Sequence, residues 1–283
     1  MARHATWAAL AVAAGLIVGC GAGKELPNAT PKGPNDDAPA AVVPAASEPA
    51  AKAYIETAVK AYTGGKPELV AKGKASRLVL TGTRAHPVDN ELVPVPTTRT
   101  AAAVWPDRFH ALDELQLRGD KETFSAWLLR PRLTMMKGNQ EYALPNAAES
   151  ELNLAADETA QHWMALFLPV TDPKAVVFDL QKLTSNQQPA QALKLSLGAF
   201  PVYRLYFDAK SDALLRVEYT VTEQGARRRK QWSMAEHKPG PEGLLLPGKM
   251  ECRHDTVVVE EWETAKWEFP AAIPDTEFSP PKK

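Results

Sequence analysis

The chain is poor in cysteine and in net charge. Its 283 residues include two cysteines, Cys20 and Cys252, and 33 Lys and Arg against 34 Asp and Glu give a net charge of −1. Acids and bases are interspersed, which argues against a dedicated nucleic-acid-binding protein. Because we expect Cys20 to be modified, no internal disulfide can form even in an oxidising compartment. Cys252 is then best explained as a small apolar residue in a strand.

The common catalytic signatures are also missing. The sequence has no Gly-x-Ser-x-Gly elbow and no His-Glu-x-x-His motif. Lys66 follows Gly64-Gly65, but Pro67 stands where a phosphate-binding loop needs Ser or Thr, and the spacing is wrong. The neighbouring carboxylates Glu260-Glu261 would point to opposite faces of a strand, so they could not flank one scissile bond. We therefore expect a protein that is not an enzyme and needs no cofactor.

Two other clusters are better explained without a ligand. His237, Cys252, His254 and Asp255 are of metal-binding types, but Cys252-x-His254 is the only tight spacing and no second pair supports it. The basic run Arg227–Lys230 could attract anionic lipid head groups, yet a solvated strand end explains it better. We expect no metal site.

The N-terminal apolar run is too short to span a bilayer. Trp7–Gly19 holds thirteen residues behind a short polar start, which is typical of a signal peptide. It ends in Leu16-Ile17-Val18-Gly19-Cys20, which resembles the lipobox of bacterial lipoproteins. In that family the Cys is acylated and becomes the new N-terminus. The alternative is an ordinary cleaved signal with an accidental Cys. We predict a signal peptide over residues 1–19 and a lipid anchor at Cys20.

Residues 20–50 are predicted to form a disordered tether. Six prolines, many alanines and almost no large apolar residues bury too little surface to offset the chain entropy. Semi-extended at ~3.1 Å per residue, about thirty residues would hold a domain up to roughly 90 Å from its anchor. A simple spacer explains the composition equally well. The remaining residues, 51–283, are long enough for one domain with one core.

The clearest structural signal is a β-hairpin over Pro201–Val221. Two runs rich in Val, Tyr, Leu and Phe alternate with a period of two and flank a polar loop. A five-residue loop would set Leu205 opposite Leu215, and a four-residue loop would pair Asp208 with Ala213. Both faces carry apolar residues, so we expect the hairpin to lie in the middle of a sheet.

A helix and a long meander account for most of the remaining domain. An apolar stripe stopped by Gly64-Gly65 predicts a helix over Pro49–Thr63. Short alternating segments separated by turn signals predict antiparallel strands, without the strand–helix alternation of parallel sheets. The final strand should be strongly bent or bulged near Glu260-Glu261. The predicted strands are Lys74–Ala85, Arg99–Val104, Arg108–Leu112, Gln116–Arg118, Glu122–Leu129, Leu133–Lys137, Glu141–Leu144, Ala192–Leu197, Arg228–Ala235, Gly243–Glu251 and Asp255–Phe269.

The pattern changes once, in the middle of the chain. Apolar residues at helical spacing predict a helix over Asp157–Leu168, ended by Pro169. A second short helix is expected to begin at Asp172-Pro173 and to use Val176 and Val177 in its stripe. Core packing and the lining of a cavity are equally good explanations of the first stripe.

This order of elements behind a lipobox resembles the outer-membrane lipoprotein carrier fold of the LolA and LolB type. Asp212 departs from the resemblance, because similar hairpins usually carry Gly there. The resemblance implies a mainly antiparallel α+β fold, a curved half-open β-barrel closed by a helical lid, over residues 51–283. It rests on Trp105-Pro106-Asp107-Arg108-Phe109, on Tyr206-Phe207-Asp208 with Leu214-Leu215-Arg216-Val217-Glu218, and on Ile273-Pro274-Asp275 with Phe278 and Pro280.

The same resemblance implies a hydrophobic ligand inside the half-barrel. We expect an exported, monomeric lipoprotein that binds lipid or the acyl chains of lipoproteins, as carrier or acceptor. Gly21 after the anchor, in place of Asp, favours the outer membrane. The alternative is a non-enzymatic interaction or stress-sensing module with an envelope protein partner. The residues predicted to line the cavity are Leu78, Leu80, Trp163, Met164, Phe167, Tyr203 and Leu205.

Overall fold

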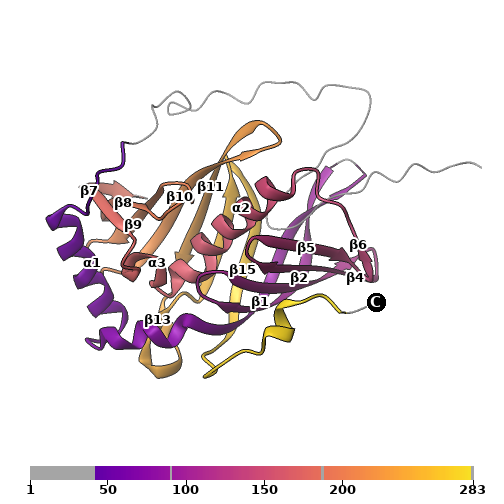
Figure 1. Ribbon diagram of the computed structural model, residues 1–283, viewed down its shortest axis with the longest axis horizontal. Coiled ribbons are helices and arrows are strands. Elements are labelled where there is room, and N and C mark those ends of the chain that lie inside the picture. Colours follow the sequence, from indigo (N-terminus) through magenta and orange to yellow (C-terminus); the bar gives the residue numbers. More distant parts are fainter. Residues whose placement is uncertain (1–41, 90, 186–187, 282–283) are drawn as a thin grey trace, which may run out of the picture.

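The computed structural model describes residues 42–89, 91–185 and 188–281. The predicted signal peptide, Cys20 and most of the predicted tether lie outside the described residues. The described part forms one open, curved antiparallel sheet with helices on it (Figure 1). This confirms the predicted fold class, a half-open barrel closed by helices. None of the helices in this part of the chain is long and apolar enough to cross a membrane.

Thirteen strands make up the large sheet. Its first half contains β1 (Ala75–Val88), β2 (Glu91–Val104), β3 (Arg108–Leu117), β4 (Asp120–Leu129), β5 (Arg132–Lys137) and β6 (Gln140–Glu141). Its second half contains β7 (Val176–Ser185), β8 (Gln188–Ser196), β9 (Tyr203–Asp208), β10 (Leu214–Glu223), β11 (Ala226–Ala235), β14 (Lys249–His254) and β15 (Val257–Glu268). A separate pair is formed by β12 (Lys238–Pro239) and β13 (Leu245–Leu246).

The chain runs through the sheet as a meander that returns to its start. Strands β1 to β6 follow one another outward on one side, and β7 to β15 lead back from the other edge. The last strand, β15, pairs with β1, so the two halves join in the middle of the sheet. Strands β6 and β7 are therefore its two edges, and the barrel stays open between them.

Helices enter the fold before the first strand and between the two halves. Helix α1 buries its predicted apolar stripe and ends at left-handed Gly64 and Gly65, which confirms that helix. Ahead of α1, Glu48 N–H donates to the Val177 carbonyl of β7 (2.9 Å), and Val177 N–H donates to Ser47 Oγ (3.1 Å). The helical elements are α1 (Pro49–Tyr62), η1 (Pro67–Lys74), α2 (Ala147–Glu158), the π-helical turn η2 (Thr159–Trp163), α3 (Leu168–Thr171), η3 (Pro241–Gly243) and η4 (Asp275–Phe278).

Residues 147–171, here called the interior segment, connect β6 to β7 and cross the concave side of the sheet (Figure 1). Every residue from 153 to 170 is buried. Small side chains in one cross-strand row, Ala101, Ala111 and Ala126, leave room for it on the first half of the sheet. The segment therefore fills the half-barrel from inside.

The predicted hairpin is confirmed as β9 and β10, and the structure selects one of its two registers. Asp208 N–H donates to the Ala213 carbonyl (2.9 Å), and Asp212 is left-handed with a φ of 56°. This is the four-residue loop. A bulge directly after it shifts the pairing, so that Leu205 lies opposite Val217.

Several boundaries differ from the sequence-based prediction. The predicted helix over Asp157–Leu168 is interrupted at left-handed Phe167 and is not ended by Pro169, which lies inside α3. The predicted strands Arg108–Leu112 and Gln116–Arg118 are one strand, β3, and the predicted strand Gly243–Glu251 is divided among η3, β13 and β14. The predicted second short helix is wrong, because its β-branched residues Val176 and Val177 belong to β7. Helix α2 begins at Ala147, ten residues ahead of the predicted start at Asp157. The prediction missed these residues because the first turns of the helix carry few large apolar side chains. Strand β2 begins at Glu91 rather than Arg99, and Pro94 and Pro96 lie inside it.

Strand β15 carries the irregularity predicted near Glu260. The register between β14 and β15 shifts between the pairs Cys252–Glu260 and Arg253–Val258. Farther along, Gly82 of β1 lies opposite Trp262, and a Cβ on Gly82 would stand 1.9 Å from the Glu261 carbonyl oxygen. Glycine is required here because the two backbones approach too closely for any side chain.

Candidate functional site

The seven residues predicted to line a cavity come together, and they do so as packed core. All belong to one hydrophobic cluster, and none is more than 4% exposed. Two cavities of about 20 and about 10 Å³ lie in the interior, and none of the seven lines either one. A volume of about 20 Å³ holds roughly one water molecule. The interior segment thus occupies the space where an acyl ligand was expected, and the ligand-lining role of the seven residues stays a prediction.

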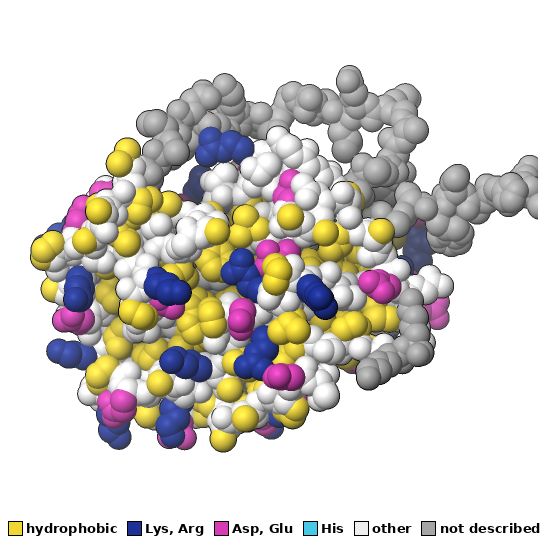
Figure 2. Space-filling model, in the orientation of Figure 1, with side chains coloured by type: hydrophobic (Ala, Val, Ile, Leu, Met, Phe, Trp, Pro, Cys, Tyr) yellow, Lys and Arg dark blue, Asp and Glu magenta, His cyan; other side chains and the backbone are white. Residues whose placement is uncertain are grey.

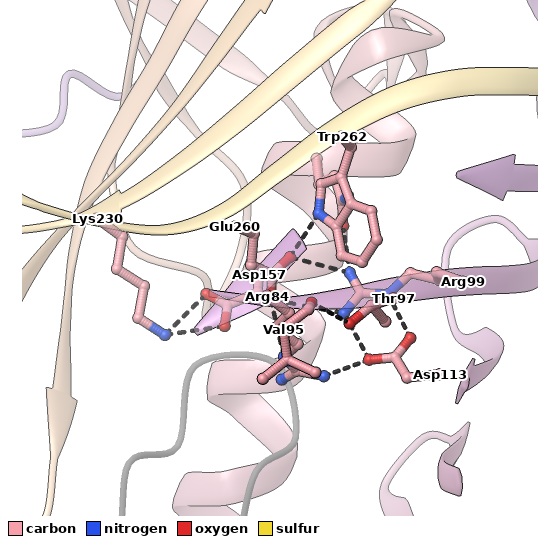
Figure 3. Close-up of polar contacts among 10 residues, drawn as sticks. Arg84, Val95, Thr97, Arg99, Asp113, Asp157, Lys230, Glu260 and Trp262 are labelled. Carbon is pink, nitrogen blue, oxygen red and sulfur yellow. Dashed lines mark hydrogen bonds and ion pairs between the residues drawn. The ribbon is translucent and has the colours of Figure 1, made fainter. Parts of the chain in front are cut away.

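Four charged side chains of the sheet form a buried network, here called the Arg99 cluster (Figure 3). Arg99 of β2 lies directly opposite Asp113 of β3, with Nε–Oδ1 2.7 Å and Nη2–Oδ2 2.9 Å. Arg84 of β1 lies directly opposite Glu260 of β15, with Nε–Oε1 3.4 Å. Arg84 also pairs with Asp113, and Arg99 Nη1 lies 3.2 Å from Glu260 Oε2. Trp262 donates from Nε1 to Glu260 (2.8 Å), and its ring lies 4.8 Å below the Arg99 guanidinium.

The charges of the Arg99 cluster balance one another without any residue from outside the sheet. Two guanidinium groups face two carboxylates, and all four side chains are about 5% exposed. Burial alone would raise the pKa of Asp113, but Arg99 and Arg84 outweigh it and hold that pKa below its usual value. Burial likewise opposes the charge on Arg99, whereas Asp113 and Glu260 raise its pKa well above the ordinary value. Arg99 and Asp113 therefore stay ionised and paired.

A second buried network, the Lys230 cluster, joins the sheet to the interior segment (Figure 3). Lys230 of β11 is fully buried and lies opposite Tyr219 of β10. Its Nζ donates to Asp157 Oδ2 (2.8 Å) and Oδ1 (3.1 Å) and lies 2.5 Å from Glu223 Oε1. Tyr219 also donates its hydroxyl to Asp157 Oδ1 (2.6 Å). One of the two anions that Lys230 holds thus comes from α2 and not from the sheet.

Asp157 is poorly stabilised as an anion despite these contacts. Burial raises its pKa to about 6, although Lys230 and Tyr219 both favour the charged form. Burial opposes the charge on Lys230 as well, but Asp157 and Glu223 raise its pKa above the ordinary value. A single ammonium therefore serves two carboxylates, and the one from the interior segment is close to protonation at neutral pH.

Glu158 adds a further buried carboxyl beside the Arg99 cluster. It is 3% exposed, lines both cavities, and forms no hydrogen bond or ion pair with the described residues. Burial raises its pKa well above the ordinary value and so favours its protonated form. Gln161 Nε2 and Trp232 Nε1, which belong to residues lining the smaller cavity, also lack a partner within the described part of the chain.

The interior holds one Ser–His contact, and its surroundings do not suit nucleophilic catalysis. Ser76 Oγ and His162 Nε2 lie 2.8 Å apart, and both residues are fully buried. Among the described residues His162 Nδ1 has no partner, so no third group orients the imidazole as a base. Burial lowers the pKa of His162 to about 3. The contact anchors the interior segment to β1.

The other candidates named from the sequence are divided between this interior and the surface. Cys252 and His254 line the smaller cavity, together with Asp157 and Glu158. Cys252 is buried, and burial raises the pKa of its thiol well above the ordinary value. Across residues 42–89, 91–185 and 188–281, no three His, Cys, Asp or Glu side chains are placed to hold a metal ion. Arg227, Arg228 and Arg229 are exposed at the start of β11. On the face shown in Figure 2, acidic and basic side chains are interspersed among apolar ones.

Sequence reasoning did not single out Arg84, Arg99 or Asp113. It counted Lys230 in a basic run at a solvated strand end, which is wrong for Lys230 because this side chain points inward and is fully buried. Each of the four is a charged residue at an inward position of a strand, flanked by residues whose alternation gives its face. That parity was readable from the sequence. The pairing was not, because it depends on the register of four strands and on the long-range contact between β1 and β15.

No protein-family model matches the chain, and no curated protein matches it. Solved structures do match, over most of its length. One is a domain described as an outer membrane lipoprotein-sorting protein from Vibrio parahaemolyticus, with 15% identity and a TM-score of 0.44, covering 79% of this chain and 97% of that chain. A LolA superfamily protein from Nitrosomonas europaea has 9% identity and a TM-score of 0.47, covering 85% and 99%. A DUF1329 family protein from Desulfovibrio piger has 9% identity and a TM-score of 0.47, covering 81% and 97%.

Proposed function

We propose that this chain is a lipid-anchored envelope protein that binds acyl chains inside the half-barrel, as a carrier or acceptor. One observation carries the proposal. The interior segment connects β6 and β7, the two edges of the sheet, so it can leave the concave side without breaking any strand pairing of the sheet. The space it vacates is walled by Leu78, Leu80, Tyr203 and Leu205, which come from both halves of the sheet.

The free energies of replacing the interior segment by an acyl chain are compatible with reversible binding. An acyl chain that buries ~14 methylenes gains roughly 11 kcal/mol, against about 4–15 kcal/mol for association. The interior segment must also be displaced, but Asp157 and Glu158 reduce that cost at neutral pH. Both have raised pKa values while buried, and both become free to ionise when the segment reaches water. Moderate affinity is what a carrier needs, because it must also release its ligand.

Hydrogen exchange of the mature chain tests this proposal. Residues 20–283 with Cys20→Ala, which carry no acyl group, would be compared with and without monomyristin, a neutral acyl probe. We expect the probe to bind and to speed amide exchange in residues 153–170, while β1, β9 and β10 stay protected. Bound probe with a protected interior segment would place the acyl chain elsewhere. No binding to well-folded protein, together with no lipid in an organic extract, would reject the acyl-binding function.

The anchor is a separate part of the proposal. The lipobox resemblance supports acylation of Cys20 and cleavage before it, and Gly21 in place of Asp supports retention on the periplasmic face of the outer membrane. Intact mass of the membrane form should show a chain that starts at Cys20 with several acyl groups, since two or more chains are needed for lasting attachment. Cys20→Ala should remove both the added mass and the membrane association. An unmodified N-terminus at another residue would reject the anchor.

A second function is favoured by the tight packing of the interior segment inside the half-barrel. The two interior cavities, of about 20 and about 10 Å³, are far too small for an acyl chain. A half-barrel that keeps its interior segment permanently in place would serve as a non-enzymatic interaction or sensing module with an envelope protein partner. The hydrogen-exchange comparison separates the two functions, because only acyl binding requires residues 153–170 to open.

A further inference from the structure

The interior segment presents two different surfaces to the sheet. Trp163, Met164 and Phe167 are apolar and lie in the core, whereas Asp157 places a carboxylate on Lys230 and Tyr219. An apolar stripe with an anionic group at one end has the composition of an acidic amphiphile. Whatever replaces the segment meets the same walls and the same donors.

Of the two buried ionic clusters, the Lys230 cluster alone loses an anion when the segment leaves. Arg99 keeps Asp113 and Glu260, which both belong to the sheet, and gives up only a 3.4 Å contact with Gln161. Lys230 keeps Glu223 but loses both oxygens of Asp157. Tyr219 loses the acceptor of its hydroxyl. The vacated interior thus contains an ammonium and a hydroxyl from neighbouring strands, aimed at one position.

We propose that the preferred ligand is an anionic amphiphile whose carboxylate or phosphate takes the place of Asp157 on Lys230 Nζ and Tyr219 Oη. The inference rests on the proposed acyl-binding function and names its substrate class. In the closed protein both donors converge on Asp157 Oδ1, at 3.1 and 2.6 Å, so the position already suits an anionic oxygen. A neutral head group cannot restore the second anion beside Lys230. Hydrogen bonds to charged groups contribute about 1.5–3 kcal/mol, or roughly 10- to 100-fold in affinity.

The experiment compares ligands that share one acyl chain. Myristate, myristoyl lysophosphatidic acid and monomyristin would be titrated at pH 8 into residues 20–283 with Cys20→Ala. We expect at least one anionic probe to bind about 10-fold or more tightly than monomyristin, and the better of the two identifies carboxylate or phosphate as the source of the charge. Equal affinities would overturn the anionic class while leaving acyl binding intact. Failure of all three probes would reject both.

Three substitutions locate the effect. Lys230→Met should bring the affinity ratio of anionic to neutral probe close to one. Tyr219→Phe keeps the ring and removes only the hydroxyl, so the ratio should fall several-fold. If circular dichroism shows that Lys230→Met is unfolded, the test of the site rests on Tyr219→Phe. Asn153→Ala is the matched control, because Asn153 ties the same segment to the Thr222 carbonyl without touching Lys230. Its ratio should equal that of the wild type. An unchanged ratio in Tyr219→Phe and in folded Lys230→Met would overturn the site.

Discussion

The Arg99 and Lys230 clusters are built from similar groups and differ in where their partners come from. Arg84, Arg99, Asp113 and Glu260 all belong to adjacent strands around the β1–β15 junction. In the Lys230 cluster, Asp157 belongs to the interior segment. The ion pairs of the Arg99 cluster therefore do not depend on the position of the interior segment, whereas the contacts between Lys230 and Asp157 require the segment to be in place.

The difference separates the buried charges that pair within the sheet from those that tie the sheet to the interior segment. Two guanidinium groups and two carboxylates balance in the Arg99 cluster, so removing any one leaves a charge without compensation. In the Lys230 cluster two carboxylates share one ammonium, and burial raises the pKa of Asp157 to about 6. A proton can replace the lost cation there. The same substitution should thus cost less in the second cluster than in the first.

The largest expected effect comes from removing Arg99. Arg99→Met leaves Asp113 and Glu260 to share Arg84, and breaking a buried ion pair from one side costs about 3–5 kcal/mol. Urea unfolding at pH 7 should show this loss. Lys230→Met should cost less than Arg99→Met, and its cost should shrink at pH 5, where Asp157 accepts a proton.

A second variant controls for loss of packing at Arg99. The double change Arg99→Met with Asp113→Leu removes one charge of each sign, leaves Arg84 with Glu260, and should recover most of the lost stability. If Arg99→Met alone cost less than about 1 kcal/mol, the cluster would have to be hydrated in solution.

The sequence predicted the parts of this fold that depend on local patterns. The hairpin around Asp208 and helix α1 follow from turn residues and apolar periodicity over short windows. The fold class followed from the succession of short strands. The first turns of helix α2 were not predicted, because most of their residues are small or polar. The helix is held instead by partners distant in sequence, such as Lys230 and Arg130.

The candidate site shows the same limit. Trp163, Met164 and Phe167 were recognised by their spacing, and they do meet Leu78 and Tyr203 in one core. Whether a stripe fills or lines a space depends on volumes that no local pattern records. The ionic clusters could not be predicted for a related reason. The partner of a charged residue at an inward strand position is known only once the strand register is known.

A smaller effect, of opposite sign, is expected at Glu158, which lies next to the Arg99 cluster without joining it. Its ordinary pKa is 4.5, and burial raises the folded-state pKa well above that value. Above pH 4.5 the unfolded chain releases this proton while the folded protein keeps it, so stability falls by about 1.4 kcal/mol per pH unit until the folded-state pKa is reached. Glu158→Gln removes the proton from both states. The variant should match the wild type near pH 4 and be more stable by up to about 3 kcal/mol at pH 7, in urea unfolding over that range.

Asp113→Asn is the matched control for Glu158→Gln, because its pKa shift has the opposite direction. The Asp113 pKa is lowered in the folded protein, so its ionised form adds stability above the ordinary value of 3.8, and that stability is lost as pH falls further. Asp113→Asn should therefore destabilise the protein at pH 7, with a loss that shrinks toward acid pH. Between pH 4.5 and 7 the Asp113→Asn curve should run below and parallel to that of the wild type, because the folded and unfolded pKa values of Asp113 both lie below this range, whereas the Glu158→Gln curve should rise away from the wild type. This contrast would separate a paired carboxylate from an unpaired one a short distance away. A Glu158→Gln curve parallel to that of the wild type from pH 4 to 7 would mean that the folded protein ionises Glu158 as readily as the unfolded chain does.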